Sequence, residues 1–165
     1  MSCAQPELTL RRFAPLLMSE ISTEIRIDAS AECIWQVLTD FPSYDLWNSV
    51  LYPIRGEAKA GARLEVRVRL LGGLGMTFRV KVLGAELGRE LRWKGQFLHP
   101  ALFAGEHSFM IEPMGNGHVR FVQREVYSGL LVPIVMLILE SSNRRVFEEM
   151  NKALKARAEQ MHKLL

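Results

Sequence analysis

The stretch PIVMLILESSNRRVFEEMNKALKARAEQMHK, residues 133–163, decides the fold of this chain. Its later part carries an apolar row at helical spacing, with charged residues elsewhere: Phe147, Met150, Leu154, Ala158 and Met161. A helix with one apolar stripe of this kind can cover one face of a sheet. We therefore predict a long C-terminal helix, from about Pro133 to about Lys163, that packs against strands formed by the preceding residues.

The first turns of this helix differ from the rest because they are apolar on every side. The run from Pro133 to Leu139 contains no charged or polar side chain. Such a helix end needs apolar surroundings beyond a single stripe. Two interpretations remain open. These turns form the wall or mouth of a hydrophobic cavity, or they are a buried helix end or a dimer contact.

Alternation of apolar and polar residues predicts strands through most of the remaining chain. Ile21, Thr23, Ile25 and Ile27 alternate with polar residues, which is typical of a half-buried strand. A further strand begins near Val50, and the same alternation then recurs in residues 64–70, 76–82, 91–97, 103–112 and 118–127. One apolar and one polar face on each strand indicates an antiparallel sheet that is covered on one side only.

Two short helices are predicted between the first strand and the others. Asp28 or Ser30 caps the first of them, and Phe41-Pro42-Ser43 ends it. The segment Tyr44-Asp45-Leu46-Trp47 indicates a second helical turn or two. The predicted class is therefore α+β: a curved antiparallel sheet of about seven strands, wrapped around the long C-terminal helix, with two short helices after the first strand.

Length and composition are those of one globular domain. The chain has 165 residues, of which 48% are hydrophobic and 24% charged, and its formal net charge is +3. Cys3 and Cys33 imply no disulfide framework, so we expect a cytoplasmic protein. The longest apolar run, residues 129–139, is well short of the roughly twenty residues that span a bilayer. We expect residues 1–18 to be a disordered extension, with a targeting segment as the alternative, and residues 19–163 to form the domain.

Three stretches resemble one large superfamily: IDASAECIWQVLTDFPSYDLWNS (residues 27–49), LRWKGQFLHPALFAGEHSFMIEP (91–113) and FEEMNKALKARAEQ (147–160). With the order of elements, they are similar to the SRPBCC or START-like superfamily, which includes the birch pollen allergen, polyketide cyclase-like proteins and lipid-transfer domains. Within it, the chain looks like the bacterial polyketide cyclase/dehydrase-like proteins. The resemblance implies a helix-grip fold with a deep apolar cavity between sheet and long helix. Members carry lipids, hormones or polyketides there, and a minority catalyse reactions.

The last two strands bring two polar residues together if their register follows the apolar pattern. Phe109 on one strand and Phe121 on the next each belong to an apolar set. For both sets to face the cavity, the numbers of paired residues must sum to an even value, and a sum near 232 pairs His107 with Glu125. A turn of three or five residues gives such a register. A turn with an even number would direct Glu125 to solvent.

This pair has two interpretations. A carboxylate beside an imidazole in an apolar pocket could act as an acid/base pair, which a cyclase would need to enolise and dehydrate a poly-β-keto chain. Alternatively, the two groups form a satisfied buried polar pair that fixes the register or orients a ligand's hydroxyl or carbonyl group. We favour the second interpretation and keep His107 and Glu125 as the candidate catalytic residues.

The expected ligand-binding residues are largely aromatic. Aromatic walls suit flat or polycyclic ligands, although aromatic residues at strand spacing also form ordinary core. The residues that we expect to line the cavity are Trp47, Trp93, Phe97, Phe103, His107, Phe109, Phe121, Gln123, Glu125, Tyr127, Ile134 and Ile138. We place the entrance near the start of the long helix and the loop His99-Pro100-Ala101-Leu102, which could act as a lid.

Outward-facing basic residues on the strands are interpreted as a solvated face: Arg63, Arg67, Arg69, Arg79, Lys81, Arg92 and Lys94. Peripheral docking on an anionic membrane is the alternative, whereas nucleic acid is not expected because aromatic residues are not interleaved with this basic surface. The histidines lack metal-ligand spacing and partner cysteines, so we predict no metal and no cofactor: His99, His107, His118 and His162.

The sequence thus predicts a protein that binds one small hydrophobic molecule, lipid- or polyketide-like, in a central cavity. Binding would serve transport or sequestration, by a monomer or weak homodimer. One alternative is a cyclase or dehydratase that uses His107 and Glu125. Another is a protein-interaction module with a filled interior. A cavity of a few hundred cubic ångströms would favour ligand binding over the interaction module.

Overall fold

The structure is a computed structural model that describes residues 17–69 and 75–164, except for the side chains of residues 138–143. Within these residues, seven strands form one antiparallel sheet in the order β1-β7-β6-β5-β4-β3-β2. The strands are β1 (Met18–Ile27), β2 (Leu51–Arg55), β3 (Arg63–Arg69), β4 (Gly75–Glu86), β5 (Glu90–Phe97), β6 (Phe103–Gly115) and β7 (His118–Ser128). The predicted antiparallel sheet is confirmed.

The helices also follow the prediction. They are α2 (Ala31–Thr39), the 3₁₀ helix η2 (Phe41–Leu46) and α3 (Val132–His162). The Ser30 hydroxyl caps α2 by accepting a hydrogen bond from the backbone N–H of Cys33 at 3.2 Å. The long helix starts and ends one residue earlier than predicted from the sequence.

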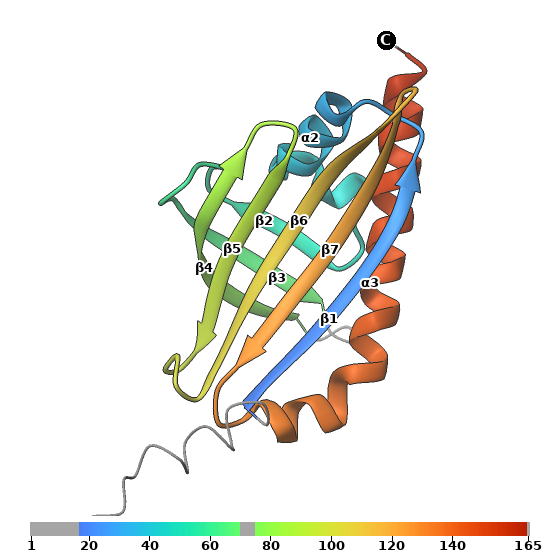
Figure 1. Ribbon diagram of the computed structural model, residues 1–165. Helices are drawn as coiled ribbons and strands as arrows, with labels where there is room; N and C mark the ends of the chain where they lie inside the picture. Colours follow the sequence, from blue (N-terminus) through green and yellow to red (C-terminus); the bar gives the residue numbers. More distant parts are fainter. Residues whose placement is uncertain (1–16, 70–74, 165) are drawn as a thin grey trace, which may run out of the picture.

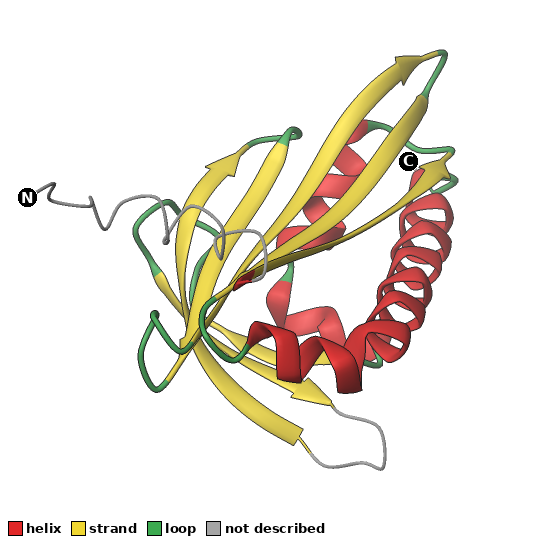
Figure 2. Ribbon diagram, turned by 60° about the horizontal axis from the view of Figure 1, so that its bottom comes forward, coloured by secondary structure: helices red, strands yellow, loops and turns green. Residues whose placement is uncertain are grey.

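The sheet curves around the helices, so that α2 and α3 lie on its concave side (Figures 1 and 2). For most of its length α3 runs beside β1 at the edge of the sheet (Figure 1). Its first turns run in a different direction, across the end of the sheet where β7 finishes (Figure 1). This α+β arrangement is the helix-grip fold that the sequence predicted.

Buried apolar residues form two clusters. The larger one packs α2 and the second half of α3 against the sheet, and it includes Ile34, Leu38, Phe121, Leu154 and Ala158. The smaller one joins the start of α3 to β1 and β7, and it contains Ile21, Tyr127, Val132, Met136 and Phe147. The thiol of Cys33 adds a polar link by donating to the Ala158 carbonyl at 3.3 Å. The helix is therefore anchored to the sheet at two places.

The β6–β7 hairpin reaches its predicted register through a bulge. Asn116 and Gly117 have positive φ angles of 53° and 76° and form a two-residue turn, flanked by the pair Gly115 and His118. That turn alone would pair residues whose numbers sum to an odd value, which is the odd register. A shift of one residue after Pro113 restores the even register, so that His107 pairs with Glu125. The predicted pairing is confirmed, but a bulge produces it rather than the length of the turn.

Backbone hydrogen bonds fasten the loop after β5 to the start of α3. The N–H of Leu130 donates to the Ala101 carbonyl at 3.0 Å, and that of Leu131 to the Leu102 carbonyl at 2.9 Å. Gly129 permits this approach: its φ is 127°, and a Cβ there would lie 2.4 Å from the Leu102 oxygen. The loop of residues 99–102 and the first turn of α3 therefore form one unit. Its action as a lid stays a prediction.

One sequence prediction falls largely outside the described part of the chain. Residues 1–16 make up most of the expected extension, which is therefore not tested. Among the described residues, no helix is long and apolar enough to cross a membrane.

We expect Leu154→Ala to lower the free energy of unfolding by about 2–5 kcal/mol, because truncation leaves a cavity beneath α3. Leu154 is 2% exposed and belongs to the larger cluster. Leu137→Ala is the matched control on the same helix: Leu137 is 88% exposed, so the change should stay below about 0.5 kcal/mol. Urea unfolding measures both values, and equal losses would contradict this packing.

Candidate functional site

A cavity of about 460 Å³ lies between the concave face of the sheet and α3. Residues of both apolar clusters border it, so it occupies the space between the two places where α3 is anchored. Six of the residues predicted to line it do so: Trp93, Phe97, Phe103, His107, Glu125 and Tyr127. The helix contributes Val135, Met136, Val146, Phe147 and Met150.

Two glycines on neighbouring strands make room for the cavity. Gly95 of β5 pairs with Gly105 of β6, and both face the hollow. A Cβ at Gly95 would lie 3.0 Å from a methyl carbon of Val80, and one at Gly105 would lie 2.7 Å from Oε1 of Glu125. On this stretch the sheet therefore presents bare backbone where other positions present side chains. Neither glycine was predicted from the sequence to line the cavity, although each occupies an inward position of an alternating strand.

The polar end of the cavity is a carboxylate held by two donors. Nδ1 of His107 lies 3.2 Å from Oε2 of Glu125, and the Tyr127 hydroxyl donates to the same oxygen at 3.1 Å. The three residues come from adjacent strands, since His107 and Glu125 form a cross-strand pair and Tyr127 follows on the same face of β7. Both partners of the His107–Glu125 pair are largely buried, with side chains 8% and 18% exposed.

Gln123 engages the other nitrogen of the imidazole. Its amide nitrogen lies 3.0 Å from Nε2 of His107 and 3.8 Å from Sδ of Met150. With an amide N–H directed at Nε2, that nitrogen accepts, so the ring proton belongs on Nδ1 and is donated to Glu125. Both nitrogens of the imidazole are therefore occupied. The Oε1 atom of Gln123 is buried and has no partner among the described residues.

Aromatic rings fix the plane of His107. Phe109 stacks on the imidazole with ring centroids 4.3 Å apart, while Phe147 and Trp93 lie at 5.1 and 5.8 Å. Phe103 stacks on Tyr127 at 5.6 Å. Because neighbours from β5, β6 and α3 hold the ring, the His107–Glu125 pair is a rigid feature of the cavity wall.

Five predicted ligand-binding residues do not line this cavity. Phe109 and Phe121 point to the concave side but are buried in the larger cluster, because α2 and the second half of α3 fill that end of the sheet. Gln123 is fully buried behind His107. Ile134 is 62% exposed, since the helical phase turns Val132 and Met136 inward instead. The side chain of Ile138 lies outside the described residues.

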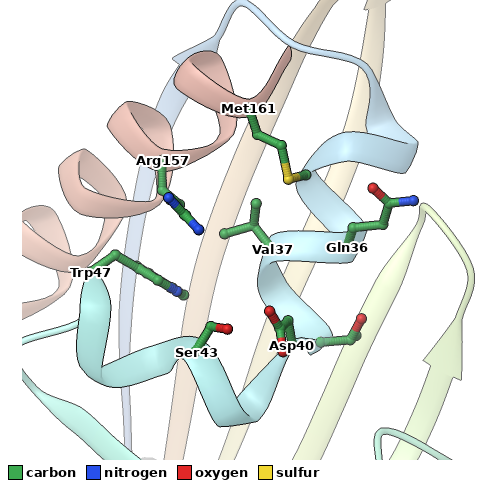
Figure 3. A pocket seen from close by; sticks show the side chains of 8 residues that line it. Gln36, Val37, Asp40, Ser43, Trp47, Arg157 and Met161 are labelled. Atoms are coloured by element: carbon green, nitrogen blue, oxygen red, sulfur yellow. The ribbon is translucent and has the colours of Figure 1, made fainter. Parts of the chain in front are cut away.

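Trp47 also does not line the central cavity. It borders a different hollow of about 380 Å³ between α2, η2 and α3 (Figure 3). Its ring packs on Tyr44 with centroids 4.6 Å apart, which directs it away from the central cavity. The lining of this second hollow mixes apolar and polar side chains: Gln36, Val37, Thr39, Asp40, Ser43, Trp47, Arg157 and Met161. Nowhere among the described residues do three or more His, Cys, Asp or Glu side chains gather as metal ligands would.

Further apolar lining residues were not predicted from the sequence. They lie on the strands farthest from β7 and on the helix, and include Val66, Val68, Phe78, Val135 and Val146. Their inward orientation follows from the alternation and from the helical stripe. Nothing in the sequence, however, separates a side chain that faces a void from one that faces another side chain.

A curved antiparallel sheet closed by a long C-terminal helix over an apolar cavity defines the helix-grip class of START-like proteins. The chain belongs to the family described as polyketide cyclase / dehydrase and lipid transport, whose pattern matches residues 18–159. The search of curated proteins finds no match.

Several solved structures share the fold. A START superfamily protein from Mycobacterium smegmatis is 24% identical, with a TM-score of 0.68 over 86% of this chain and 98% of its own. The Zhui aromatase/cyclase from Streptomyces sp. R1128 is 16% identical, with a TM-score of 0.68 over 87% and 94%. Norcoclaurine synthase from Thalictrum flavum is 16% identical, with a TM-score of 0.67 over 89% and 97%. Identities this low show a common fold only.

We expect His107 and Gln123 to be energetically coupled. His107→Leu and Gln123→Leu should each destabilise the protein by about 1–3 kcal/mol, because each leaves a buried polar partner unpaired. The double variant should lose less than the sum, by about 0.5–3 kcal/mol. Urea unfolding of the four proteins gives the coupling energy. Tyr44→Phe, which removes a hydrogen bond to the Leu38 carbonyl, is the control: combined with His107→Leu, its loss of stability should add to that of His107→Leu. If the losses of His107→Leu and Gln123→Leu are also additive, the contact between these two residues is contradicted.

Proposed function

We propose that this protein binds one small hydrophobic molecule in the cavity between the sheet and α3. The observation that carries the proposal is the cavity itself: about 460 Å³, with mostly apolar walls and one polar end at His107, Glu125 and Tyr127. Ligand sites in proteins have this combination of apolar lining and few convergent polar groups, in volumes of roughly 300–1,000 Å³. A filled interior, as the interaction-module alternative requires, does not fit this cavity.

The family supports a lipid- or polyketide-like ligand. Its description names polyketide cyclases, dehydrases and lipid transport, and a structural neighbour is an aromatase/cyclase. The flat rings of Trp93, Phe103 and Tyr127 on the walls suit a planar or ring-containing molecule. In this proposal the ligand buries its apolar body against these rings and directs its polar group to Glu125.

The proposed entrance lies beside the first turn of α3. Phe97 lines the cavity yet is 42% exposed, and the loop that follows it is bonded to Leu130 and Leu131. Val135 and Met136, one turn further, also border the cavity. Movement of this loop together with the start of α3 would open the cavity to solvent.

Filling the cavity should abolish binding without unfolding the protein. Val68 lines the cavity, whereas Arg67, the preceding residue of β3, is exposed on the opposite face. We expect Val68→Trp to weaken binding of the neutral apolar dye Nile red by about tenfold or more, and Arg67→Trp to leave it unchanged. Fluorescence titration measures the affinities, and circular dichroism checks the fold. Equal affinities for the two variants would place the dye elsewhere and overturn the proposal.

A second candidate function is catalysis by the His107–Glu125 pair, which lies at the cavity wall with its polar atoms 3.2 Å apart. A cyclase or dehydratase needs a base that removes a proton next to a carbonyl group. In the observed arrangement the imidazole offers no free nitrogen, because Gln123 occupies Nε2 and Glu125 occupies Nδ1. Binding is therefore the function that we favour.

The two functions differ in one measurable reaction. Acetoacetyl-N-acetylcysteamine is a short β-keto thioester whose C2 protons exchange with D₂O when a base enolises it. For a binding protein we expect the exchange rate, followed by proton NMR, to be the same with the wild-type protein and with Glu125→Gln. An acceleration by the wild type that Glu125→Gln removes would establish catalysis instead.

A further inference from the structure

We propose that Glu125 makes the polar end of the cavity an acceptor-only site, so that the ligand carries a hydrogen-bond donor there and an anionic group is rejected. This inference rests on the proposed function, because it concerns the ligand of the same cavity. It adds the chemical class of the ligand's polar group: a hydroxyl or an ammonium group on an apolar body, rather than a carboxylate.

The two oxygens of Glu125 have different surroundings. Oε2 accepts from Nδ1 of His107 and from the hydroxyl of Tyr127. Oε1 has no hydrogen-bond partner among the described residues, although Glu125 lines the cavity and its side chain is 18% exposed. A ligand that fills the cavity displaces the water that can reach this oxygen, and a ligand without a donor would leave the oxygen unpaired, which is unfavourable. A ligand that supplies the donor would remove this deficit.

Gly105 places Oε1 at the cavity surface. The carboxylate lies against β6, where a Cβ on residue 105 would come within 2.7 Å of Oε1. Any larger residue at position 105 would displace the carboxylate, and with it the two hydrogen bonds to Oε2. The glycine therefore acts as a positioning residue for the acceptor, and the ligand is expected to meet Glu125 directly above it.

Among the described residues, the donors near this end are already used. The Nδ1 proton of His107 and the hydroxyl of Tyr127 are directed at Glu125, and the Gln123 amide is directed at His107 and Met150. A ligand carboxylate placed here would meet a second carboxylate with no donor between them. Apolar rings surround the position, so this repulsion is screened less than it would be in water.

Arg69 is the other charged residue that borders the cavity, at a distance from Glu125. It lies on β3, which β6, β5 and β4 separate from β7 in the sheet, and its guanidinium stacks on Tyr52 at 4.4 Å. An anionic molecule could therefore bind with its charge at Arg69. The experiment must separate such binding from an effect of Glu125, which a comparison with a Glu125 variant achieves.

Four ligands with the same ring system test the inference: naphthalene, 2-naphthol, 2-naphthylmethylammonium and 2-naphthoate. We expect the wild-type protein to bind the alcohol and the ammonium ion about tenfold or more tightly than the carboxylate. Glu125→Gln removes the charge but keeps the shape. In that variant the ammonium ion should lose about tenfold in affinity, the carboxylate should gain about tenfold, and naphthalene should be unchanged. Isothermal titration calorimetry measures all eight affinities.

The outcomes separate this inference from the proposed function. Tight binding of 2-naphthoate by the wild type, unaffected by Glu125→Gln, would overturn the acceptor-only site and leave the binding function intact. Failure of all four compounds and of Nile red to bind would remove the binding function and the inference with it. If Glu125→Gln does not fold, which thermal unfolding followed by circular dichroism shows, the ranking of the four ligands on Arg69→Gln decides the matter, because that variant lacks the other charged group that borders the cavity.

Discussion

The one-residue bulge at Met114, between Pro113 and Gly115, is the constraint on which the cavity chemistry depends. Side chains on a strand alternate between faces, so an odd register of β6 against β7 would put Glu125 and His107 on opposite faces of the sheet. The two-residue turn at Asn116 and Gly117 by itself gives that odd register. The bulge inserts the compensating residue and brings the pair together. A local feature of backbone geometry, far from the ligand, thus decides what the ligand meets.

The cavity persists because the structure around it is anchored on both sides. The larger apolar cluster fixes the second half of α3, and the smaller one fixes its first turns. Between them the Gly95–Gly105 pair leaves bare backbone on the sheet. Filling this space would bury more apolar surface and stabilise the fold. An unfilled interior is therefore a feature that stability alone does not explain, whereas the proposed ligand binding does.

The sequence predicts well which face of the sheet a side chain points to. It predicts poorly whether that side chain borders the cavity or lies in the packed core. Alternation on the strands and the apolar stripe of the helix predicted the fold, and the parity of the register predicted that His107 pairs with Glu125. Phe109 and Phe121 were assigned to the right face but the wrong surroundings, because the pattern does not say how far α2 and α3 extend over that face. Ile134 was misplaced for a related reason: an entirely apolar helix start carries no phase, so only packing shows which side chains point inward.

The contact between Gln123 and His107 bears most directly on whether this cavity binds or reacts. An imidazole works as a general base only if one nitrogen has a lone pair within reach of the substrate. Here Gln123 reaches Nε2 from behind the wall, and Nδ1 donates to Glu125. Any catalytic cycle through His107 would have to break one of these contacts in a position that Phe109 and Phe147 hold rigid. Glu125 is not so confined, since Oε1 has no protein partner among the described residues. In the proposed binding function, the group that meets the ligand is therefore the carboxylate, and the histidine positions it.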